Sequence, residues 1–435
     1  MEQKKHIHMI GIGGIGMSAL AQLYMARGYI VSGSDRTASL VIDMLQEKGA
    51  NVVLGQGAEN IPEKCEMVVY SAAVHGDNVE YAAAKERGIP MHTYFAALGE
   101  ATRESKNIVI TGTHGKTTTT AMVAKILVDA GENPTVIAGS ILSEYGSNFV
   151  QGRSDLCVIE GCEYERHFLH LSAHILGITN IELDHTDYYK SEEDLHTAFT
   201  EMAARVPEGG TIVVQDTSLH GAICHKEHSG RQLSGVVAPC VEYGAAKVPQ
   251  LRTPGDFNKE NARLAKTLAL AWKQDIPEET IDISLAAFSG TWRRFEYKGN
   301  TERGAVVYDD YAHHPTAVGK TLAMARAEFP EKKLLVVFHP HLYSRTRDFF
   351  AGFAKALAIA DEAHVLPVFA AREEHDPSVS SEKLAEAVTA AGGNGYFIAD
   401  FAAVEELLKA QSVDTLCITM GAGDVYKAAD EVVKA

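Results

Sequence analysis

Short apolar and β-branched runs alternate with longer amphipathic stretches along most of the chain, which is the pattern of α/β domains. The first alternation predicts four strands, at residues 7–10, 29–32, 52–54 and 67–70. It also predicts a helix at residues 17–27, after the first strand. The second alternation predicts three strands, at residues 107–111, 156–159 and 175–179. A helix that ends at Gly131 follows the first of these strands. Residues 218–254 are polar and poorly periodic, which indicates only loops and short strands.

The last third of the chain repeats this alternation. It predicts five core strands: residues 306–308, 334–338, 364–368, 396–398 and 416–419. Helices separate these strands, including residues 316–327 and 402–408. Together the alternations predict three α/β domains: residues 1–105, 106–292 and 293–435.

Composition and charge fit a globular protein and exclude several classes of function. Of the 435 residues, 46% are apolar and 22% are charged, which excludes long disorder and a small disulfide scaffold. The net charge is −17 with no Lys/Arg-rich tract, so a nucleic acid or an anionic membrane would be repelled. No segment reaches the ~18 apolar residues of a membrane helix, and the cysteines form no C-x-x-C pair. We therefore expect a cytoplasmic protein with no nucleic-acid partner and no membrane insertion.

A glycine-rich turn joins the first predicted strand to its helix. Gly11, Gly13 and Gly16 fit the pattern G-x-G-x-x-G, and Asp35 follows at about the spacing of a ribose-binding acid. Glycines allow the backbone to approach a diphosphate, and the helix N-terminus supplies amide donors. The pattern predicts a nucleotide diphosphate. It fits a nicotinamide dehydrogenase, and the alternative is a tight turn without a ligand.

A second loop of this kind follows the first strand of the second alternation. Residues 111–118 read T-G-T-H-G-K-T-T and lack only the first glycine of a full P-loop. Gly112 and Gly115 allow backbone amides to surround phosphates. Lys116 can reach the β and γ phosphates, and the Thr117 hydroxyl can ligate Mg²⁺. This loop is the strongest chemical signal in the chain, and it predicts the use of ATP.

Two nucleotide sites in separate domains weaken the dehydrogenase interpretation and suit an enzyme that activates a nucleotide-linked substrate with ATP. Together with later segments, they resemble the Mur ligase family of peptidoglycan synthesis over nearly the full chain. The matching segments occur in the family's order: residues 8–18, 32–35, 111–118, 160, 179–180, 184–185, 255–262, 293–295, 309–316, 343–346 and 421–423.

The resemblance implies an architecture and a reaction. It implies a Rossmann-like N-terminal domain that binds a UDP-sugar, a central P-loop ATPase-like domain, and a Rossmann-like C-terminal domain for the acceptor. It also implies that ATP phosphorylates the carboxylate of UDP-N-acetylmuramate and that an amino acid, L-alanine first, attacks the acyl phosphate. Because a carboxylate and a triphosphate are both negative, cations must neutralise them during transfer.

The resemblance also implies roles for individual residues. The UDP-sugar would be bound by Gly11, Gly13, Gly14, Ile15, Gly16, Ser34 and Asp35. ATP would be bound by Gly112, Thr113, His114, Gly115, Lys116, Thr117, Thr118, Asn258, Asn261, Arg294 and Asp310. Mg²⁺ would be held by Thr117, Glu160 and His185. The catalytic set would be Lys116, His185, His313 and Arg345, with His313 or His314 orienting or deprotonating the amine, as a pKa of about 6.5 permits.

The chain departs from the family pattern at three places. Leu342 replaces the first arginine of the acceptor segment, expected to help hold the amino-acid carboxylate, and such a loss weakens binding by about 1.5–3 kcal/mol. Residues 160–165 read E-G-C-E-Y-E, where family members read E-A-D-E-S-D beside the proposed metal site. Phe257 stands where histidine is usual.

These departures leave other functions open. The acceptor could be another amino acid or a recycled peptide, or the chain could bind a UDP-sugar without catalysis. An NAD-dependent oxidoreductase would rest on the first glycine turn alone. His339 and His341 form an H-x-H pattern that suggests a zinc hydrolase as a further alternative. Against it, family members usually have glutamine at position 339, and a hydrolase needs no phosphate loop.

Overall fold

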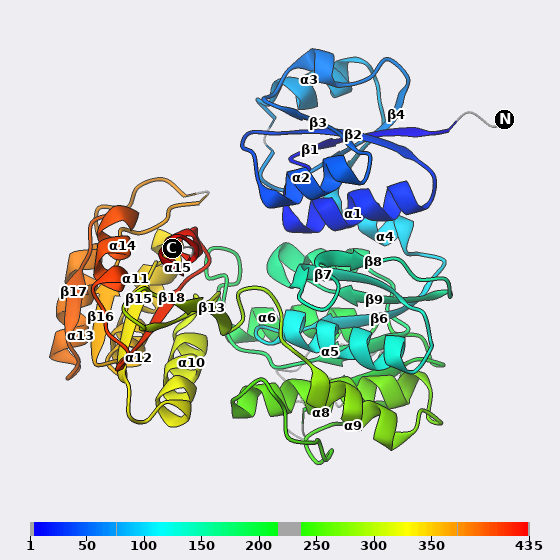
Figure 1. The fold of residues 1–435 in the computed structure, drawn as a ribbon. Helices are drawn as coiled ribbons and strands as arrows, with labels where there is room; N and C mark the ends of the chain where they lie inside the picture. The colour runs from blue at the N-terminus through cyan, green and yellow to red at the C-terminus, as the bar shows by residue number, and fades with distance from the viewer. Residues whose placement is uncertain (1–3, 75, 216–235, 372, 434–435) are drawn as a thin grey trace. The chain divides into compact units, whose positions relative to one another are not determined.

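The strands form three sheets within residues 4–74, 76–215, 236–371 and 373–433, the part of the chain that the computed structural model describes (Figure 1). The chain divides into two compact units. The first unit comprises residues 1–181, 195–250 and 260–288, and contains the first two sheets. The second unit comprises residues 182–194, 251–259 and 289–435, and contains the third sheet.

The N-terminal sheet is fully parallel and has the order β3-β2-β1-β4-β5. Its strands are β1 His6–Ile10, β2 Ile30–Asp35, β3 Asn51–Leu54, β4 Cys65–Tyr70 and β5 Met91–Thr93. Its helices are α1 Ile15–Ala26, α2 Leu40–Glu47, η1 Ala58–Asn60, α3 Val79–Glu86 and α4 Tyr94–Ala101. The strand order reverses between β1 and β4, which is where open α/β sheets bind ligands. The four predicted strands and the helix are confirmed, whereas the three-residue β5 was not predicted.

The central sheet has the order β12-β11-β10-β6-β9-β7-β8. Its strands are β6 Lys106–Thr111, β7 Thr135–Leu142, β8 Ser147–Val150, β9 Leu156–Glu160, β10 Ile175–Ile178, β11 Thr211–Val214 and β12 Cys240–Glu242. The helices in this part of the sequence are α5 Lys116–Asp129, η2 Tyr164–His170, α6 Glu192–Ala203, α8 Asp256–Trp272 and α9 Glu278–Ala287. The polar region predicted as loops and short strands contains β12, and its residues 218–235 lie outside the described part of the chain.

The C-terminal sheet has the order β13-β14-β18-β15-β16-β17 and is parallel except for β13. Its strands are β13 Glu296–Asn300, β14 Val306–Asp310, β15 Lys333–Phe338, β16 Glu362–Val365, β17 Gly395–Phe397 and β18 Thr415–Met420. Its helices are α10 Pro315–Glu328, α11 Tyr343–Asp348, α12 Phe350–Leu357, α13 Ser381–Ala390, α14 Phe401–Lys409 and α15 Tyr426–Val433. The predicted strand at 364–368 is wrong in its second half, because β16 ends at Val365 and Pro367 has no amide to donate.

The core of the third sheet is built around β15, whose residues 334–338 are all buried. Leu334, Val336 and Phe338 pack into one apolar cluster with residues of α10, α12 and α13. Leu335 and Val337 pack on the opposite face with residues of α14 and α15. Successive side chains of a strand point to opposite faces, so a strand covered by helices on both sides requires a continuous apolar run. Among the described helices, none combines the length and apolar character needed to cross a membrane.

Candidate active site

The glycine-rich turn follows β1 and is fixed by hydrogen bonds to the end of β2. The amides of Gly11 and Ile12 donate to the Ser34 carbonyl at 2.8 and 3.1 Å. The Gly13 amide donates to Asp35 Oδ2 at 2.9 Å, and a Cβ on Gly13 would lie 2.8 Å from that oxygen. Asp35 therefore shapes the turn directly, and glycine at position 13 is required by this close approach.

The amino end of α1 is open at this turn. Gly14 is its N-cap residue and no side chain caps the helix, while Ile15 and Gly16 begin its first turn. The first amides of a helix have no partner within the helix, so they are available to an anion. The Ser34 side chain has a different task, because it is fully buried and its hydroxyl donates to Glu80 Oε2 at 2.5 Å.

A hollow of about 320 Å³ lies near the carboxyl ends of the N-terminal strands. Its lining residues come from the segments after β2 and β3 and from the start of α3: Arg36, Gln56, Asp77, Asn78 and Val79. Glu80 fixes part of this rim, since its Oε1 accepts hydrogen bonds from the Gly57 amide at 3.1 Å and from Asn60 at 2.6 Å. Sequence reasoning missed these residues, and the available signal was their position after successive parallel strands.

The phosphate loop connects β6 to α5 and depends on two glycines with positive φ. Gly112 has φ +130°, and a Cβ there would lie 2.0 Å from Thr179 Oγ1. Gly115 has φ +84°, and a Cβ there would lie 2.3 Å from Asn261 Oδ1. Both positions combine a conformation that favours glycine with a space too small for any side chain.

Asn180 holds the middle of the phosphate loop. Its carbonyl accepts a hydrogen bond from the Thr113 amide at 3.0 Å. Its side chain bridges the backbone of His114, accepting from the amide and donating to the carbonyl, both at 3.0 Å. The loop is therefore shaped by a residue at the end of the neighbouring strand β10, to which the sequence analysis gave no role.

Lys116 begins α5 and forms a buried ion pair with Glu163. Lys116 Nζ lies 2.8 Å from Glu163 Oε2, and Glu163 is 3% exposed. The ammonium also donates to the carbonyls of Gly112 and Thr113 at 2.5 and 3.1 Å. Burial opposes protonation, but the charge of Glu163 outweighs it and raises the pKa of Lys116. A permanent cation is thus fixed beside the loop.

Thr117 and Glu160 lie together as the proposed magnesium pair requires. The Thr117 hydroxyl donates to Glu160 Oε1 at 2.9 Å, and the Gly139 amide donates to Glu160 Oε2 at 2.6 Å. A hydroxyl and a carboxylate are the hard oxygen ligands that Mg²⁺ prefers. The donor set therefore fits Mg²⁺. Thr118, the next residue of α5, is buried.

The other residues proposed for ATP or metal are divided between the two units. Asn261 lies in the first unit beside the phosphate loop, with its Oδ1 3.4 Å from the Thr119 hydroxyl. Asn258 lies in the second unit and donates from Nδ2 to the Pro254 carbonyl at 2.7 Å. His185 also lies in the second unit, with φ +53°, and its amide donates to Asp184 Oδ1 at 2.7 Å. The structure thus brings Thr117 and Glu160 together within one unit and places His185 in the other.

Arg345 and Asp184 form a buried pair in the second unit. Arg345 Nε donates to Asp184 Oδ1 at 2.9 Å, and Arg345 Nη1 lies 3.2 Å from His341 Nδ1. Asp184 is 5% exposed and Arg345 is 4% exposed. Although burial works in the opposite direction, the Arg345 guanidinium holds the pKa of Asp184 well below its usual range. His341 Nδ1 therefore faces the Arg345 guanidinium, whose positive charge disfavours a zinc ion at this nitrogen.

A hydrogen bond to the backbone fixes the tautomer of His313. Its Nδ1 lies 2.9 Å from the Tyr311 carbonyl, which can only accept, so Nδ1 carries the hydrogen and Nε2 has the lone pair. Burial, and then the charge of Arg345, hold the pKa of His313 well below its usual value. The ring is consequently neutral at physiological pH.

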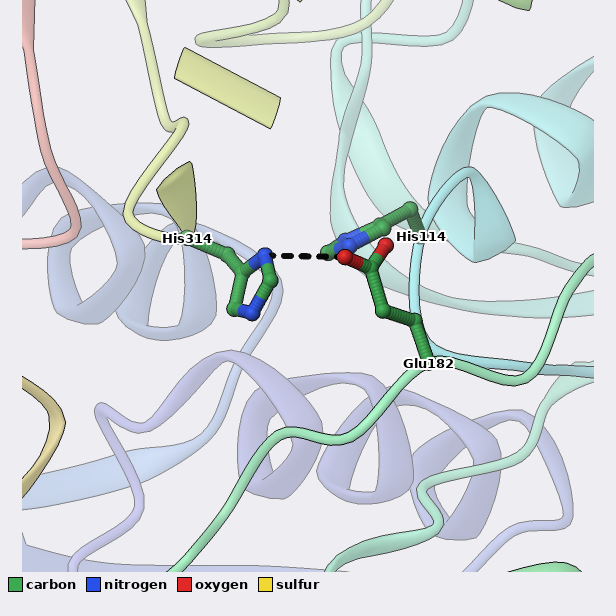
Figure 2. A group of neighbouring side chains, drawn as sticks. All are labelled: His114, Glu182 and His314. Carbon is green, nitrogen blue, oxygen red and sulfur yellow. Dashed lines mark ion pairs between the residues drawn. The ribbon is translucent and has the colours of Figure 1, made fainter. Parts of the chain in front are cut away.

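His314 is the N-cap residue of α10. Its Nδ1 accepts a weak hydrogen bond from the Thr316 amide at 3.4 Å, which caps the helix. Glu182 Oε1 lies 3.9 Å from the same ring nitrogen (Figure 2). The same oxygen also accepts a hydrogen bond from the Thr316 hydroxyl. Of the two histidines, His313 is the better candidate for contact with the incoming amine.

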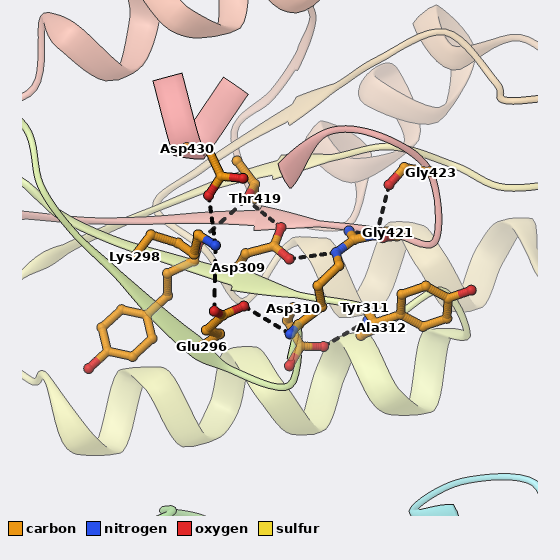
Figure 3. Close-up of polar contacts among 12 residues, drawn as sticks. Glu296, Lys298, Asp309, Asp310, Tyr311, Ala312, Thr419, Gly421, Gly423 and Asp430 are labelled. Carbon is orange, nitrogen blue, oxygen red and sulfur yellow. Dashed lines mark hydrogen bonds and ion pairs between the residues drawn. The ribbon is translucent and has the colours of Figure 1, made fainter. Parts of the chain in front are cut away.

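Arg293 organises the loops at the carboxyl ends of β14 and β18. Its guanidinium donates to Asp309 Oδ2 at 2.7 Å and to the carbonyls of Gly423 and Gly421 at 2.9 and 2.6 Å. Figure 3 labels these three acceptor residues. The neighbouring Arg294 lies over the Tyr311 ring at 5.0 Å. The hydrogen bonds of Arg293 therefore stabilise the fold, whereas Arg294 stacks on the partly buried ring of Tyr311.

Asp310 ends β14 and accepts two backbone hydrogen bonds. The amides of Phe295 and Ala312 donate to its two carboxyl oxygens, both at 2.7 Å. Burial raises the pKa of Asp310 to about 6, against the opposing charge of Arg294. The protonated form of Asp310 is therefore favoured in the folded protein at mildly acidic pH.

We expect this shift to appear in the pH dependence of stability. An unfolded aspartate has a pKa of about 3.9. The raised folded-state pKa gives a contribution that is present below about pH 4 and lost as the pH rises through about 6. Relative to wild type, Asp310→Asn should therefore gain about 2 kcal/mol of unfolding free energy between pH 4 and pH 7 in urea titrations. Asp256→Asn, at a side chain 92% exposed, is the control. A difference that does not vary with pH would contradict the assignment.

Two of the residues that depart from the family pattern, Leu342 and His339, are buried, whereas Cys162 and Phe257 are partly exposed. Leu342 is 1% exposed and has φ +71°, and its amide donates to the Phe369 carbonyl at 2.9 Å. Burial raises the pKa of Cys162 to about 12, so a neutral thiol replaces the carboxylate of the pattern. Burial lowers the pKa of His339 to about 4, and its ring packs edge-on against Phe369 and Phe401. His339 is thus a neutral aromatic packing residue.

Comparison with known proteins gives matches from end to end. Models of one family match three consecutive segments: "Mur ligase family, catalytic domain" at residues 6–106, "Mur ligase middle domain" at 110–238 and "Mur ligase, glutamate ligase domain" at 293–423. The UDP-N-acetylmuramate–L-alanine ligase of Lachnoclostridium phytofermentans is 37% identical, over 99% of this chain and 98% of its own length. The ligase of the same name from Lachnospira eligens is 38% identical over the same shares.

A solved structure matches equally completely. The crystal structure of a UDP-N-acetylmuramate–alanine ligase from Thermotoga maritima superimposes with a TM-score of 0.82. It is 26% identical in sequence, and the match covers 99% of both chains.

Proposed function

Because the chain belongs to the Mur ligase family, an α/β family of ATP-dependent ligases that form amide bonds, we propose that it joins L-alanine to the carboxylate of UDP-N-acetylmuramate in peptidoglycan synthesis. The observation that carries this substrate assignment is the end-to-end similarity to ligases of that name. The intact Lys116–Glu163 and Thr117–Glu160 pairs support catalysis over UDP-sugar binding alone, and family membership argues against an NAD-dependent oxidoreductase.

Each domain has one task in this proposal. Residues 1–105 bind the UDP-sugar, with the glycines at positions 11, 13 and 14 shaping the turn and the first amides of α1, at Ile15 and Gly16, facing the diphosphate. Residues 106–292 bind ATP through the phosphate loop, and residues 293–435 bind the acceptor. Asn258, Asn261, Arg294 and Asp310 complete the ATP site by analogy with the family, and the cytoplasm is the proposed location.

The first half-reaction must overcome repulsion between two anions. A carboxylate oxygen of the muramyl group attacks the γ phosphorus of ATP, and the bond from that phosphorus to the β–γ bridging oxygen breaks. ADP departs, and the muramyl carboxylate has become an acyl phosphate. Lys116 neutralises part of the charge on the β and γ phosphates in the transition state. Mg²⁺, held by Thr117 and Glu160 and, by resemblance, by His185, would supply further positive charge.

The second half-reaction needs a neutral amine. The amine attacks the acyl carbonyl, loses a proton, and the tetrahedral intermediate collapses with loss of phosphate. His313 Nε2 has the lone pair to accept that proton or to orient the amine, because Nδ1 donates to the Tyr311 carbonyl. Arg345 supplies positive charge for the acceptor carboxylate and holds Asp184 and His341 in place.

The acceptor is the part of the proposal with a specific rival. Leu342 is buried at the position of an arginine that would pair with the amino-acid carboxylate, which favours another amino acid or a peptide as the second candidate. The test is phosphate release from ATP with Mg²⁺, UDP-N-acetylmuramate and a panel of amino acids and short peptides. Release that needs both the UDP-sugar and L-alanine supports the proposal. Nucleotide binding without release for any acceptor would favour a binding protein, and NADH formation without ATP would refute the ligase.

Leu342→Arg tests the acceptor site in the same assay. If L-alanine is the acceptor, the added guanidinium should lower its KM by roughly 10-fold, the effect of a hydrogen bond between charged groups. Leu342→Met controls for the change in side-chain shape and should leave this KM unchanged. A KM for L-alanine that rises in Leu342→Arg, with a peptide remaining the better substrate, would favour the second candidate.

A further inference from the structure

Tyr94 lies where the N-terminal sheet leads into α4, and its ring packs against the first turn of α1. Thr93 caps α4, since its Oγ1 accepts a hydrogen bond from the Ala96 amide at 3.3 Å. A Cβ on Gly16 would lie 2.6 Å from Tyr94 Cζ and 2.9 Å from the Tyr94 hydroxyl oxygen. The last glycine of the turn therefore makes room for the phenol, and the hydroxyl lies at the amino end of α1.

This hydroxyl is available as a donor. Among the described residues it has no hydrogen-bond partner, although the side chain is largely buried. Burial raises the pKa of Tyr94 well above its usual value, and the negative charge of Glu160 acts in the same direction. The phenol thus keeps its proton, and it lies close enough to Glu160 to sense that charge. It is near both the glycine turn and the residue proposed for Mg²⁺.

Two contacts fix α4 in this position. A Cβ on Gly99 would lie 2.1 Å from the His170 carbonyl oxygen, so α4 packs backbone to backbone on the end of η2. Phe95 stacks on His167 with ring centroids 3.8 Å apart and planes 12° apart. Because η2 follows Glu160 closely in sequence, α4 is fastened to the phosphate-loop side of the first unit. Tyr94 is consequently held against α1 by neighbours on both sides.

We propose that the Tyr94 hydroxyl donates a hydrogen bond to a diphosphate oxygen of the bound UDP-sugar, beside the first amides of α1. This inference rests on the proposed function, because it takes the UDP-sugar as the ligand of the glycine turn. A phosphate oxygen bound at the amides of Ile15 and Gly16 lies within reach of a hydroxyl that is 2.9 Å from the Cβ position of Gly16. Tyr94 is then a substrate-binding residue that also explains why position 16 must be glycine.

The test compares ligands with and without the diphosphate. Tyr94→Phe keeps the ring against Gly16 and removes only the hydroxyl. We expect it to weaken UDP binding in calorimetry by roughly 10-fold and to raise the KM for UDP-N-acetylmuramate similarly. Uridine binding, followed by NMR, and the KM for ATP should stay unchanged. Tyr24→Phe is the matched control, because its hydroxyl lies 3.5 Å from the Ala97 carbonyl in the same pair of helices, away from the turn.

Each outcome of this test has one meaning. Equal loss of uridine and UDP binding, or a lower melting temperature in Tyr94→Phe alone, would show a structural role and overturn the inference. UDP binding equal to wild type would also overturn it, and would leave the proposed function standing. A wild-type protein that binds neither UDP nor the UDP-sugar would instead refute the proposed function itself.

Discussion

Replacing Lys116 by alanine is expected to lower kcat by on the order of 10³-fold, the loss typical for one preorganised electrostatic group at a reacting centre. The reason is geometric: the ammonium is fixed by Glu163 and by the carbonyls of Gly112 and Thr113 before any nucleotide arrives. UDP-sugar binding should remain nearly unchanged, because the glycine turn follows a strand of a different sheet. Phosphate release under saturating substrates and calorimetric UDP binding measure the two quantities.

The Lys116–Glu163 pair provides a control for folding. Lys116→Ala leaves the Glu163 carboxylate buried without its cation, which destabilises a protein by about 3–5 kcal/mol when the charge is fully enclosed. The double variant Lys116→Ala/Glu163→Gln removes that charge and should recover most of the stability without recovering activity. If the double variant also regained turnover, Lys116 would act only through the fold. Loss of UDP binding in Lys116→Ala would contradict the division of tasks between domains.

Much of the fold could be predicted from the sequence because the central strands are buried on both faces. A run such as residues 334–338 is apolar throughout, so its pattern identifies the strand without knowledge of its neighbours. The strand β13, Glu296–Asn300, could not be found in this way, since it is a polar edge strand that depends on pairing with β14. The end of β16 was misplaced because buried Leu366 continues the apolar run after the strand has ended.

From the residue pattern alone, without the family resemblance that paired Thr117 with Glu160, the candidate site was predictable only where its chemistry is local. Residues 111–118 contain glycines, lysine and threonines at fixed spacing, and the structure gives them the expected strand–loop–helix setting. Asn180, Glu163 and Tyr94 were not predicted, because each acts on a segment far away in sequence; the Lys116–Glu163 contact, for example, spans 47 positions. Such partners depend on the order of strands in the sheet, which hydrophobic patterning does not determine.

Arg345→Ala is expected to lower the unfolding free energy by about 3–5 kcal/mol at neutral pH, because Asp184 would remain charged and buried without its partner. The same change should raise the KM for the amino acid and leave the KM for ATP unchanged. Arg347→Ala is the matched control in the same helix. Its side chain is 53% exposed and pairs with Asp348 and Asp376, so its loss should change stability by less than about 1 kcal/mol.

The pH dependence of this destabilisation distinguishes charge from packing. In the wild type the depressed pKa of Asp184 gives stability that is present above the unfolded value of about 3.9 and is lost only as the pH falls through the lower folded value. In Arg345→Ala burial alone acts on Asp184, so its folded pKa should rise above 3.9 and its contribution should be lost as the pH increases. The difference between the two proteins should therefore be larger at pH 7 than at pH 4, because the variant loses stability across this range while the wild type does not. A destabilisation that is equal at both pH values would show that Arg345 acts by filling space and not through its charge. In that case Arg345→Lys, which keeps a positive charge, would show the same dependence of unfolding free energy on pH as Arg345→Ala.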